Sequence, residues 1–354
     1  MSKKTKILLS LCLIFIVAFF GTKFYLDKSY LKDYDRKQII GEDRYKTIVD
    51  ISNLEWKRSK EAILISTSSI TDGISATSFA HEKNMPMFFI ESSDLNKTIK
   101  SQLKKLGVEK VYIIGGKKSI SKKVEIQLTK SRIGIERIGG KDGFETSLLL
   151  AKKVYGITNK RDVAVVNIQH GVPDGVSLAS AAAKNHIPIV MMNKSDKMEM
   201  IQFAKDNKIE NTYIIGNEDQ ITPSFKKAMP NPLRVTDKNR FETNLAIIKQ
   251  FYNLNNVNEV YYTKGGIYSN ADFVDTLSLS VVAAKQNKPI LLSELENVND
   301  NQFKFMKENN IKKINEVGFK LTRPKLITKE TIRIIVTILI IVLALITLKR
   351  VIYL

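Results

Sequence analysis

The chain has 354 residues, and its 44% content of hydrophobic residues is enough to bury a substantial core. Its one cysteine, Cys12, excludes a disulfide framework, so core packing must hold the fold together. The formal net charge of +20 favours association with polyanions.

The first predicted element is an apolar run from Ile7 to Thr22, which three lysines precede. A basic start followed by an apolar run is the layout of an export signal. Bulky residues interrupt the small residues expected before a cleavage site, which favours an uncleaved signal anchor over a cleaved signal peptide. Residues 1–26 are therefore predicted to be a signal anchor or signal peptide.

Three similar units follow. The segments IIGEDRYKT, RIGGKDGFET and RVTDKNRFET begin at Ile39, Arg137 and Arg234. This spacing is far above the roughly 20–50 residues of stacked structural repeats, so each unit is expected to be a small domain. The three predicted repeats cover residues 39–136, 137–233 and 234–323.

Further landmarks recur in the same order in every unit. Each unit has an aspartate that leads a stretch of small residues, then a proline, then a glycine after an apolar run. The three sets are Asp72, Asp174 and Asp275; Pro86, Pro188 and Pro289; and Gly115, Gly216 and Gly318.

Short apolar runs alternate with longer amphipathic stretches within each unit. In the first unit, strands are predicted over 62–67, 85–90 and 111–115, and helices over 72–83 and 95–106. Strands that alternate with helices indicate a parallel sheet with right-handed crossovers. The predicted fold class is α/β, with three tandem parallel-sheet modules.

A second apolar segment, from Ile334 to Leu348, lies near the C-terminus between basic residues. It predicts a transmembrane helix within residues 332–354, because a buried core helix would need polar positions on one face. Basic residues at both ends would lie in the cytoplasm, which places the repeats outside the cell membrane, in contact with the wall. There, anionic wall polymers or lipid headgroups are expected as partners, and nucleic acid is not.

Asp72, Asp174 and Asp275 fall just after a predicted strand, where α/β folds place their ligands. They are candidates for contact with a ligand or cation. The alternative is that each aspartate is the N-cap of the helix that follows.

Arg44 and Arg240 hold matching positions in DRYKT and NRFET, where the middle unit has Gly143. Each arginine is a candidate for pairing with an anionic polymer. The alternative is that it pairs with an acid of the neighbouring unit.

The glycine turn at Gly115 and Gly116, followed by two lysines, invites comparison with a phosphate-binding loop. The second copy carries acidic residues there, and no complete phosphate motif is present, so a turn that needs positive φ is predicted instead. The three histidines do not recur at equivalent positions, and no catalytic or metal signature is found in the sequence. No cofactor, metal or enzyme activity is predicted.

The motifs RIGGKDGFET, PDGVSLASAAAKNHIPIVMM and TYIIG resemble the type 2 cell-wall-binding repeat of Gram-positive surface proteins, in three copies from Ile39 to Arg323. The resemblance implies Rossmann-like or Toprim-like modules in a pseudo-threefold arrangement. Two membrane helices are predicted to flank these modules. The family resemblance also implies non-covalent attachment to an anionic wall polysaccharide or teichoic-acid-like polymer. The residues that match the family's core arginine and Ile-Leu-Leu strand are Arg44, Arg240, Ile290, Leu291 and Leu292.

Three functions follow as hypotheses. The first is a membrane-tethered, non-catalytic protein that binds an anionic wall glycopolymer. The second is an envelope scaffold that binds partner proteins through the same fold. The third is a polymer-processing enzyme that depends on the three repeated aspartates.

Overall fold

The computed structural model describes residues 31, 33–294 and 297–321, and Asp35–Leu321 form one compact unit. Within it, the described strands form three parallel four-stranded sheets, in the order β3-β2-β4-β5, β7-β6-β8-β9 and β11-β10-β12-β1. This confirms the prediction of three parallel-sheet α/β modules. The strands are β1 Asp35–Ile39, β2 Glu61–Ser66, β3 Met87–Ile90, β4 Lys110–Ile114, β5 Gly134–Ile138, β6 Asp162–Asn167, β7 Ile189–Met192, β8 Asn211–Ile215, β9 Pro232–Val235, β10 Glu259–Lys264, β11 Ile290–Ser293 and β12 Lys313–Val317.

Helices alternate with these strands along the chain. They are α2 Arg44–Asn53, α3 Ile70–Glu82, α4 Lys97–Leu106, α5 Lys122–Lys130, α6 Gly143–Tyr155, α7 Val172–Lys184, α8 Lys197–Asp206, α9 Pro223–Ala228, α10 Arg240–Phe251, α11 Phe273–Lys285 and α12 Asp300–Glu308. We call the first sheet with α2 to α5 the first module, the second sheet with α6 to α9 the second module, and the third sheet with α10 to α12 the third module.

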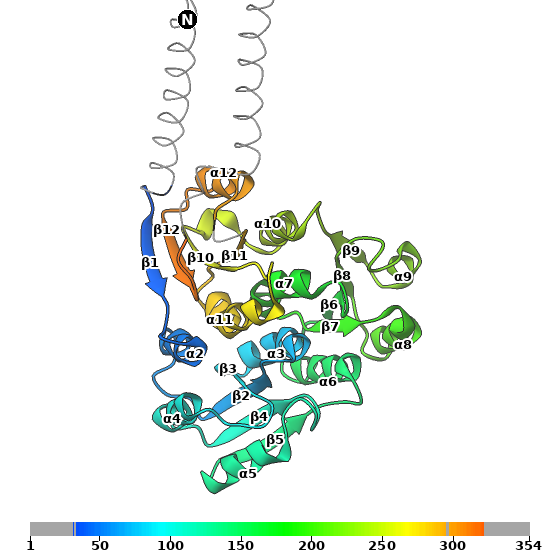
Figure 1. The fold of residues 1–354 in the computed structure, drawn as a ribbon. Helices are drawn as coiled ribbons and strands as arrows, with labels where there is room; N and C mark the ends of the chain where they lie inside the picture. The colour runs from blue at the N-terminus through cyan, green and yellow to red at the C-terminus, as the bar shows by residue number, and fades with distance from the viewer. Residues whose placement is uncertain (1–30, 32, 295–296, 322–354) are drawn as a thin grey trace, which may run out of the picture. The chain divides into compact units, whose positions relative to one another are not determined.

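The opening strand of each repeat joins the sheet of another module. β5 and β9 pair with β4 and β8 of the preceding module, and the predicted boundaries at 136/137 and 233/234 fall inside these two strands. β1, which opens the first repeat, pairs with β12 of the third module, with Ile39 opposite Val317 (Figure 1). The strand β1 is therefore an edge strand of the third sheet.

The helices that contain the repeated aspartates form the centre of the unit. α3, α7 and α11 contact one another pairwise, and the sheets lie outside them (Figure 1). Small residues allow this close approach: a Cβ on Gly73 would lie 2.9 Å from Leu277, and one on Gly175 would lie 3.0 Å from Ile74. The small-residue stretches therefore serve packing between modules, in agreement with the pseudo-threefold arrangement that the resemblance implies.

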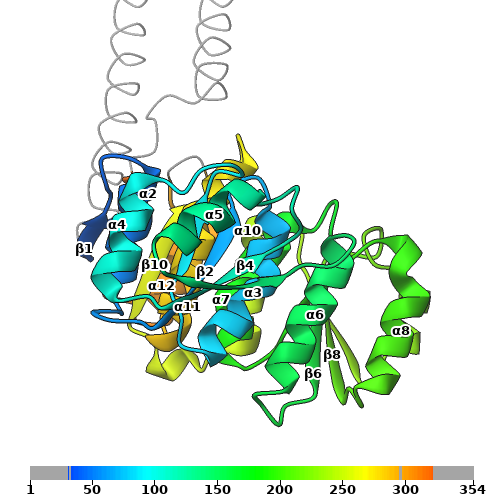
Figure 2. The ribbon, with the colours of Figure 1, turned by 90° about the horizontal axis from the view of Figure 1, so that it is seen from below.

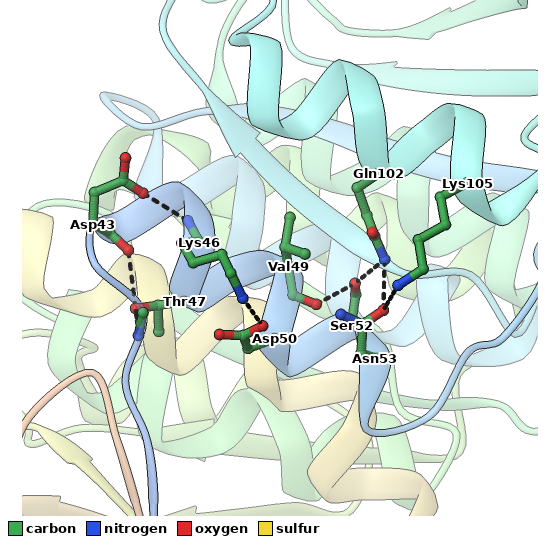
Figure 3. A network of polar contacts seen from close by, with 10 residues as sticks. Asp43, Lys46, Thr47, Val49, Asp50, Ser52, Asn53, Gln102 and Lys105 are labelled. Carbon is green, nitrogen blue, oxygen red and sulfur yellow. Dashed lines mark hydrogen bonds and ion pairs between the residues drawn. The ribbon is translucent and has the colours of Figure 1, made fainter.

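The repeated motif D/N-x-x-x-T is a helix cap. Asp43, the N-cap of α2, accepts a hydrogen bond from the Lys46 backbone at 2.7 Å, and the Thr47 hydroxyl donates to the Asp43 carbonyl (Figure 3). Asp142 and Asn239 are the N-caps of α6 and α10. Aspartate and asparagine are favoured there because they satisfy free amides of the first helical turn. The strongest sequence landmark thus has a structural role.

The start of each module is also fixed by contacts to its own sheet or helices. Gln102 of α4 donates to Ser52 and Asn53 at the end of α2, both at 2.9 Å (Figure 3). In the second module, Ser147 of α6 accepts from the Met191 backbone of β7. The opening helix therefore packs on its own module, although the strand before it joins another.

The two predicted membrane segments, Ile7 to Thr22 and Ile334 to Leu348, lie outside the described residues. Within the described ranges, no helix combines the length and the apolar character needed to cross a bilayer.

Candidate functional site

The repeated aspartates lie where strand order reverses in each sheet. The chain leaves β2 to form β3 on one side of it, then returns to form β4 on the other side. Such a switch point opens a crevice at the carboxyl ends of the two strands, which is where parallel α/β sheets bind ligands. Asp72 follows β2 and Gly115 follows β4, so both lie at this crevice.

None of the three aspartates caps its helix, so the alternative of an N-cap is wrong. The N-caps of α3, α7 and α11 are Ser69, Gly171 and Asp272, and none of them makes a side-chain capping bond. Each helix begins two residues before the repeated aspartate, which therefore lies inside the first turn. Asp72 and Asp174 are buried, with 5% and 8% of their surface exposed.

Each aspartate instead packs beneath the glycine turn of its own module. Gly115, Gly216 and Gly318 have φ of 93°, 111° and 74°, which confirms the predicted positive φ. A Cβ on Gly216 would touch the Oδ2 of Asp174 at 3.5 Å, and a Cβ on Gly115 or Gly318 would collide with the Oδ2 of Asp72 or Asp275. The two repeated landmarks therefore form one structural pair in every module.

The pairs differ in their polar partners. Burial raises the pKa of Asp72, while hydrogen bonds from Ser69, at 2.5 Å, and Ser119 oppose the rise. Burial raises the pKa of Asp174 to about 6 against a hydrogen bond from Gln220 and the charge of Arg240.

The third pair has basic neighbours. Burial raises the pKa of Asp275 to about 6 against the charges of Arg44 and Lys264. Its Oδ1 is buried without a hydrogen-bond partner among the described residues. A carboxyl with a pKa near 6 in a crevice is a candidate functional group, and it is also costly to keep ionised.

The candidate arginines lie near the aspartate of the neighbouring module. Arg240 opens α10 in the third module, and its charge acts on Asp174 of the second. Its Nη1 donates to the carbonyls of Gly265 and Gly266 at 3.0 and 2.9 Å. Arg44 of the first module acts in the same way on Asp275 of the third.

The junction between the first and second modules has no arginine at this position. At the matching position in the second module, a Cβ on Gly143 would lie 3.9 Å from the Thr71 hydroxyl, next to Asp72. At two of the three junctions the arginine therefore acts by its charge on an acid of the neighbouring module, and a direct ion pair with that acid stays a prediction.

We expect the substitution Arg240→Ala to lower the free energy of unfolding by about 2 kcal/mol, because two charge-assisted bonds to carbonyl groups are lost. Urea denaturation measures the change. Arg44→Ala is the matched control, since the Arg44 side chain is exposed and should cost less than about 0.5 kcal/mol. Unchanged stability together with loss of wall binding would instead assign Arg240 to the ligand.

Two further arginines donate hydrogen bonds to the glycine turns, and neither was predicted from the sequence as a site residue. Arg137 donates to the carbonyls of Gly115 and Gly116 at 2.8 and 3.1 Å. Arg234 donates to the carbonyl of Gly216 at 2.5 Å. Both arginines stand at the start of a sequence repeat, and that periodicity was the signal that could have found them. The turns present carbonyl oxygens to a guanidinium, which does not suit a phosphate.

Ile290, Leu291 and Leu292 lie in β11 and are 3%, 0% and 0% exposed. Their side chains belong to the core of the third module. A contribution of this strand to polymer binding stays a prediction, and it would act through packing.

A polar cleft of about 680 Å³ opens at the carboxyl ends of β6, β7 and β8 in the second module. Amide side chains, a histidine and Lys194 line much of it, and Gln220 connects it to Asp174. Such groups can hydrogen-bond hydroxyls and pair with an anion. The lining residues are Asn167, Gln169, His170, Asn193, Lys194, Ser195, Asn217, Asp219 and Gln220.

The family model for cell wall binding domain 2 matches residues 38–125, 137–226 and 234–338. The chain belongs to the cell wall binding domain 2 family. The family resemblance predicted from the motifs is thereby confirmed, and a wall-binding role with a location at the cell surface or wall follows from it.

Curated relatives carry the same family region within longer proteins. The chain is 28% identical over 311 residues to the N-acetylmuramoyl-L-alanine amidase LytC of Bacillus subtilis. The aligned region spans 88% of this chain and 59% of that protein. It is 30% identical over 261 residues to the amidase enhancer of the same species, spanning 73% of this chain and 34% of that protein. The chain thus covers less than two thirds of either relative.

Solved structures support the fold. Cwp6 from Clostridium difficile superposes with a TM-score of 0.74 at 26% identity, over 82% of this chain and 46% of that one. Cwp8 from the same organism superposes with a TM-score of 0.72 at 23% identity, over 84% and 51%. The cell wall binding domain 2 region is a binding module in this family.

Proposed function

We propose that this protein is a non-catalytic, membrane-tethered protein that attaches without a covalent bond to an anionic wall glycopolymer of the teichoic-acid type. The family match in three copies, across most of the chain, is the observation that carries the proposal. The apolar segments predicted in residues 1–26 and 332–354 would supply the tether.

Charge favours an anionic partner. With the terminal segments 1–22 and 329–354 contributing +3 each to the total of +20, residues 23–328 carry +14. An excess of this size attracts polyanions, and the attraction weakens with salt.

The excess is concentrated on the first module. Residues 92–132 hold 11 basic and 3 acidic residues, a net charge of +8, whereas residues 194–233 of the second module hold 6 of each. α4 and α5, which carry most of these lysines, lie in front of the first sheet in the view from below (Figure 2). We define the lysine-rich face as the exposed side chains of Lys97, Lys100, Lys104, Lys117, Lys118, Lys122, Lys123 and Lys130.

The lysine-rich face is open to a polymer. None of its eight lysines forms an ion pair with an acidic residue in the part of the chain that the structure describes. A polymer phosphate or carboxylate could approach them without displacing an internal partner. We propose this face as the main contact for the polymer, with the cleft of the second module as a further contact.

The test is retention of the purified chain on isolated cell walls over a salt series. We expect retention at low salt and at least tenfold weaker retention in about 1 M salt, where the Debye length falls to about 3 Å. Walls stripped of anionic polymer should retain little protein. Equal retention on stripped walls, or co-purification of a stoichiometric protein partner from them, would replace the proposal with the scaffold hypothesis.

A further inference from the structure

His81, Glu82 and His186 meet at the junction of the first and second modules. His81 and Glu82 end α3, and His186 lies in the turn between α7 and β7. The Glu82 Oε1 lies 3.3 Å from the His81 Nδ1 and 2.7 Å from the His186 Nδ1. One ligand atom from each residue lies within 4.8 Å of the other two.

The other two junctions provide an internal comparison. The positions equivalent to His81, Glu82 and His186 hold alanine, lysine and asparagine in both other repeats. At the junction of the third and first modules, the Lys285 Nζ donates to the Asn84 Oδ1 at 2.6 Å. Asn84, His186 and Asn287 share positive φ of 53°, 63° and 53°, so the backbone is the same. Only one of three equivalent junctions therefore carries metal-ligating side chains.

The cluster has the chemistry of a transition-metal site. Tetrahedral ligands at about 2.0–2.2 Å from Zn²⁺ are about 3.3 Å apart, close to the spacings around Glu82. The His186 side chain is 44% exposed, so water can reach the remaining coordination position.

We propose that His81, Glu82 and His186 bind a divalent transition-metal ion of the Zn²⁺ type, which cross-links the first and second modules. Two imidazoles and one carboxylate suit Zn²⁺ better than Mg²⁺ or Ca²⁺, which prefer oxygen ligands. The site is structural in kind and independent of the lysine-rich face.

The experiment titrates Zn²⁺ by calorimetry into the full chain after metal removal with a chelator, at a fixed pH near 7.5 because metal affinity depends on pH. We expect one ion per chain, and a rise in melting temperature of about 5 °C at about 100 times the Kd. Co²⁺ in place of Zn²⁺ should give the visible spectrum of a tetrahedral site. No binding by the unsubstituted chain, or a Co²⁺ spectrum like that of the aqueous ion, would overturn the proposal.

Substitutions that introduce the residues found at equivalent positions of the other repeats should keep the variants folded. His81→Ala and His186→Asn each place a residue that the equivalent junctions already hold, and each should weaken Zn²⁺ binding at least tenfold. The double variant should show no Zn²⁺-dependent rise above its own metal-free melting temperature. His170→Asn, at an exposed histidine of the second module, is the matched control and should bind as the parent does. Full Zn²⁺ binding by the double variant would refute the assignment.

Discussion

Asp174→Asn is expected to raise the free energy of unfolding at pH 7, by up to about 3 kcal/mol. Burial raises the pKa of Asp174 from 3.8 to about 6, and raising a pKa by one corresponds to about 1.4 kcal/mol. The substitution removes the cost of keeping a buried carboxylate ionised. The new amide can also donate to the Gln220 Oε1, which is buried without a partner among the described residues.

The gain depends on pH in a defined direction. Between about pH 4 and pH 6 the folded protein binds more protons at Asp174 than the unfolded chain does, so the contribution of this group to stability falls as pH rises through that window. Asparagine does not titrate. The variant and the parent should therefore be close in stability at pH 4 and diverge by pH 7.

Urea denaturation across this pH range measures the effect. Asp275→Asn should behave similarly, since burial raises the pKa of Asp275 to about 6 as well. Asp206→Asn, at an exposed position on α8, should change stability by less than about 0.5 kcal/mol. A loss of more than about 1 kcal/mol in Asp174→Asn at pH 7 would mean that the glycine turn requires the negative charge.

Local sequence signals predicted the modules well. The spacing of apolar runs located the strands, and the helix predicted over 95–106 ends at Leu106 in the structure, before Gly107 with φ of 75°. These features depend on residues close together in the chain. The recurrence of Gly115, Gly216 and Gly318 likewise marked a backbone requirement that the structure confirms.

Features that depend on pairing across the chain could not be predicted. Nothing in the segment DRKQI indicates that β1 pairs with β12, about 280 residues later, because strand pairing is not encoded in local periodicity. The approach of Arg240 to Asp174 and of Arg44 to Asp275 follows from the same packing between modules. The repeated aspartates showed the position of a site, but their surroundings required the fold.

The start of the helix explains why the N-cap alternative for the repeated aspartates is wrong. The dipeptide Asp72-Gly73 predicts a helix start because aspartate is a strong N-cap. α3 begins at Ile70 instead, since its first residues pack into the core and Ile70 is 6% exposed. Tertiary packing therefore shifted the helix start by two residues and turned a capping residue into a buried one.

Removing four charges from the lysine-rich face should weaken binding to anionic wall polymer about a hundredfold at low salt. The variant replaces Lys97, Lys100, Lys104 and Lys123 with glutamine, which keeps the helices and their length. An exposed lysine contributes about 0.5–1 kcal/mol to attraction toward an anionic surface, so four together contribute about 3 kcal/mol. Retention on purified walls, compared with the parent across a salt series, measures the loss.

A matched variant separates this face from total charge. Replacing Lys205, Lys208, Lys226 and Lys227 with glutamine also removes four charges, but from the second module, where residues 194–233 carry no net charge. If a polymer contacts the lysine-rich face, this control should lose less than about threefold, because the acidic neighbours already offset those lysines. Equal losses in the two variants would show that attraction depends on net charge alone. In that case the eight lysines of α4, α5 and the turn between β4 and α5 would form no distinct polymer-binding surface.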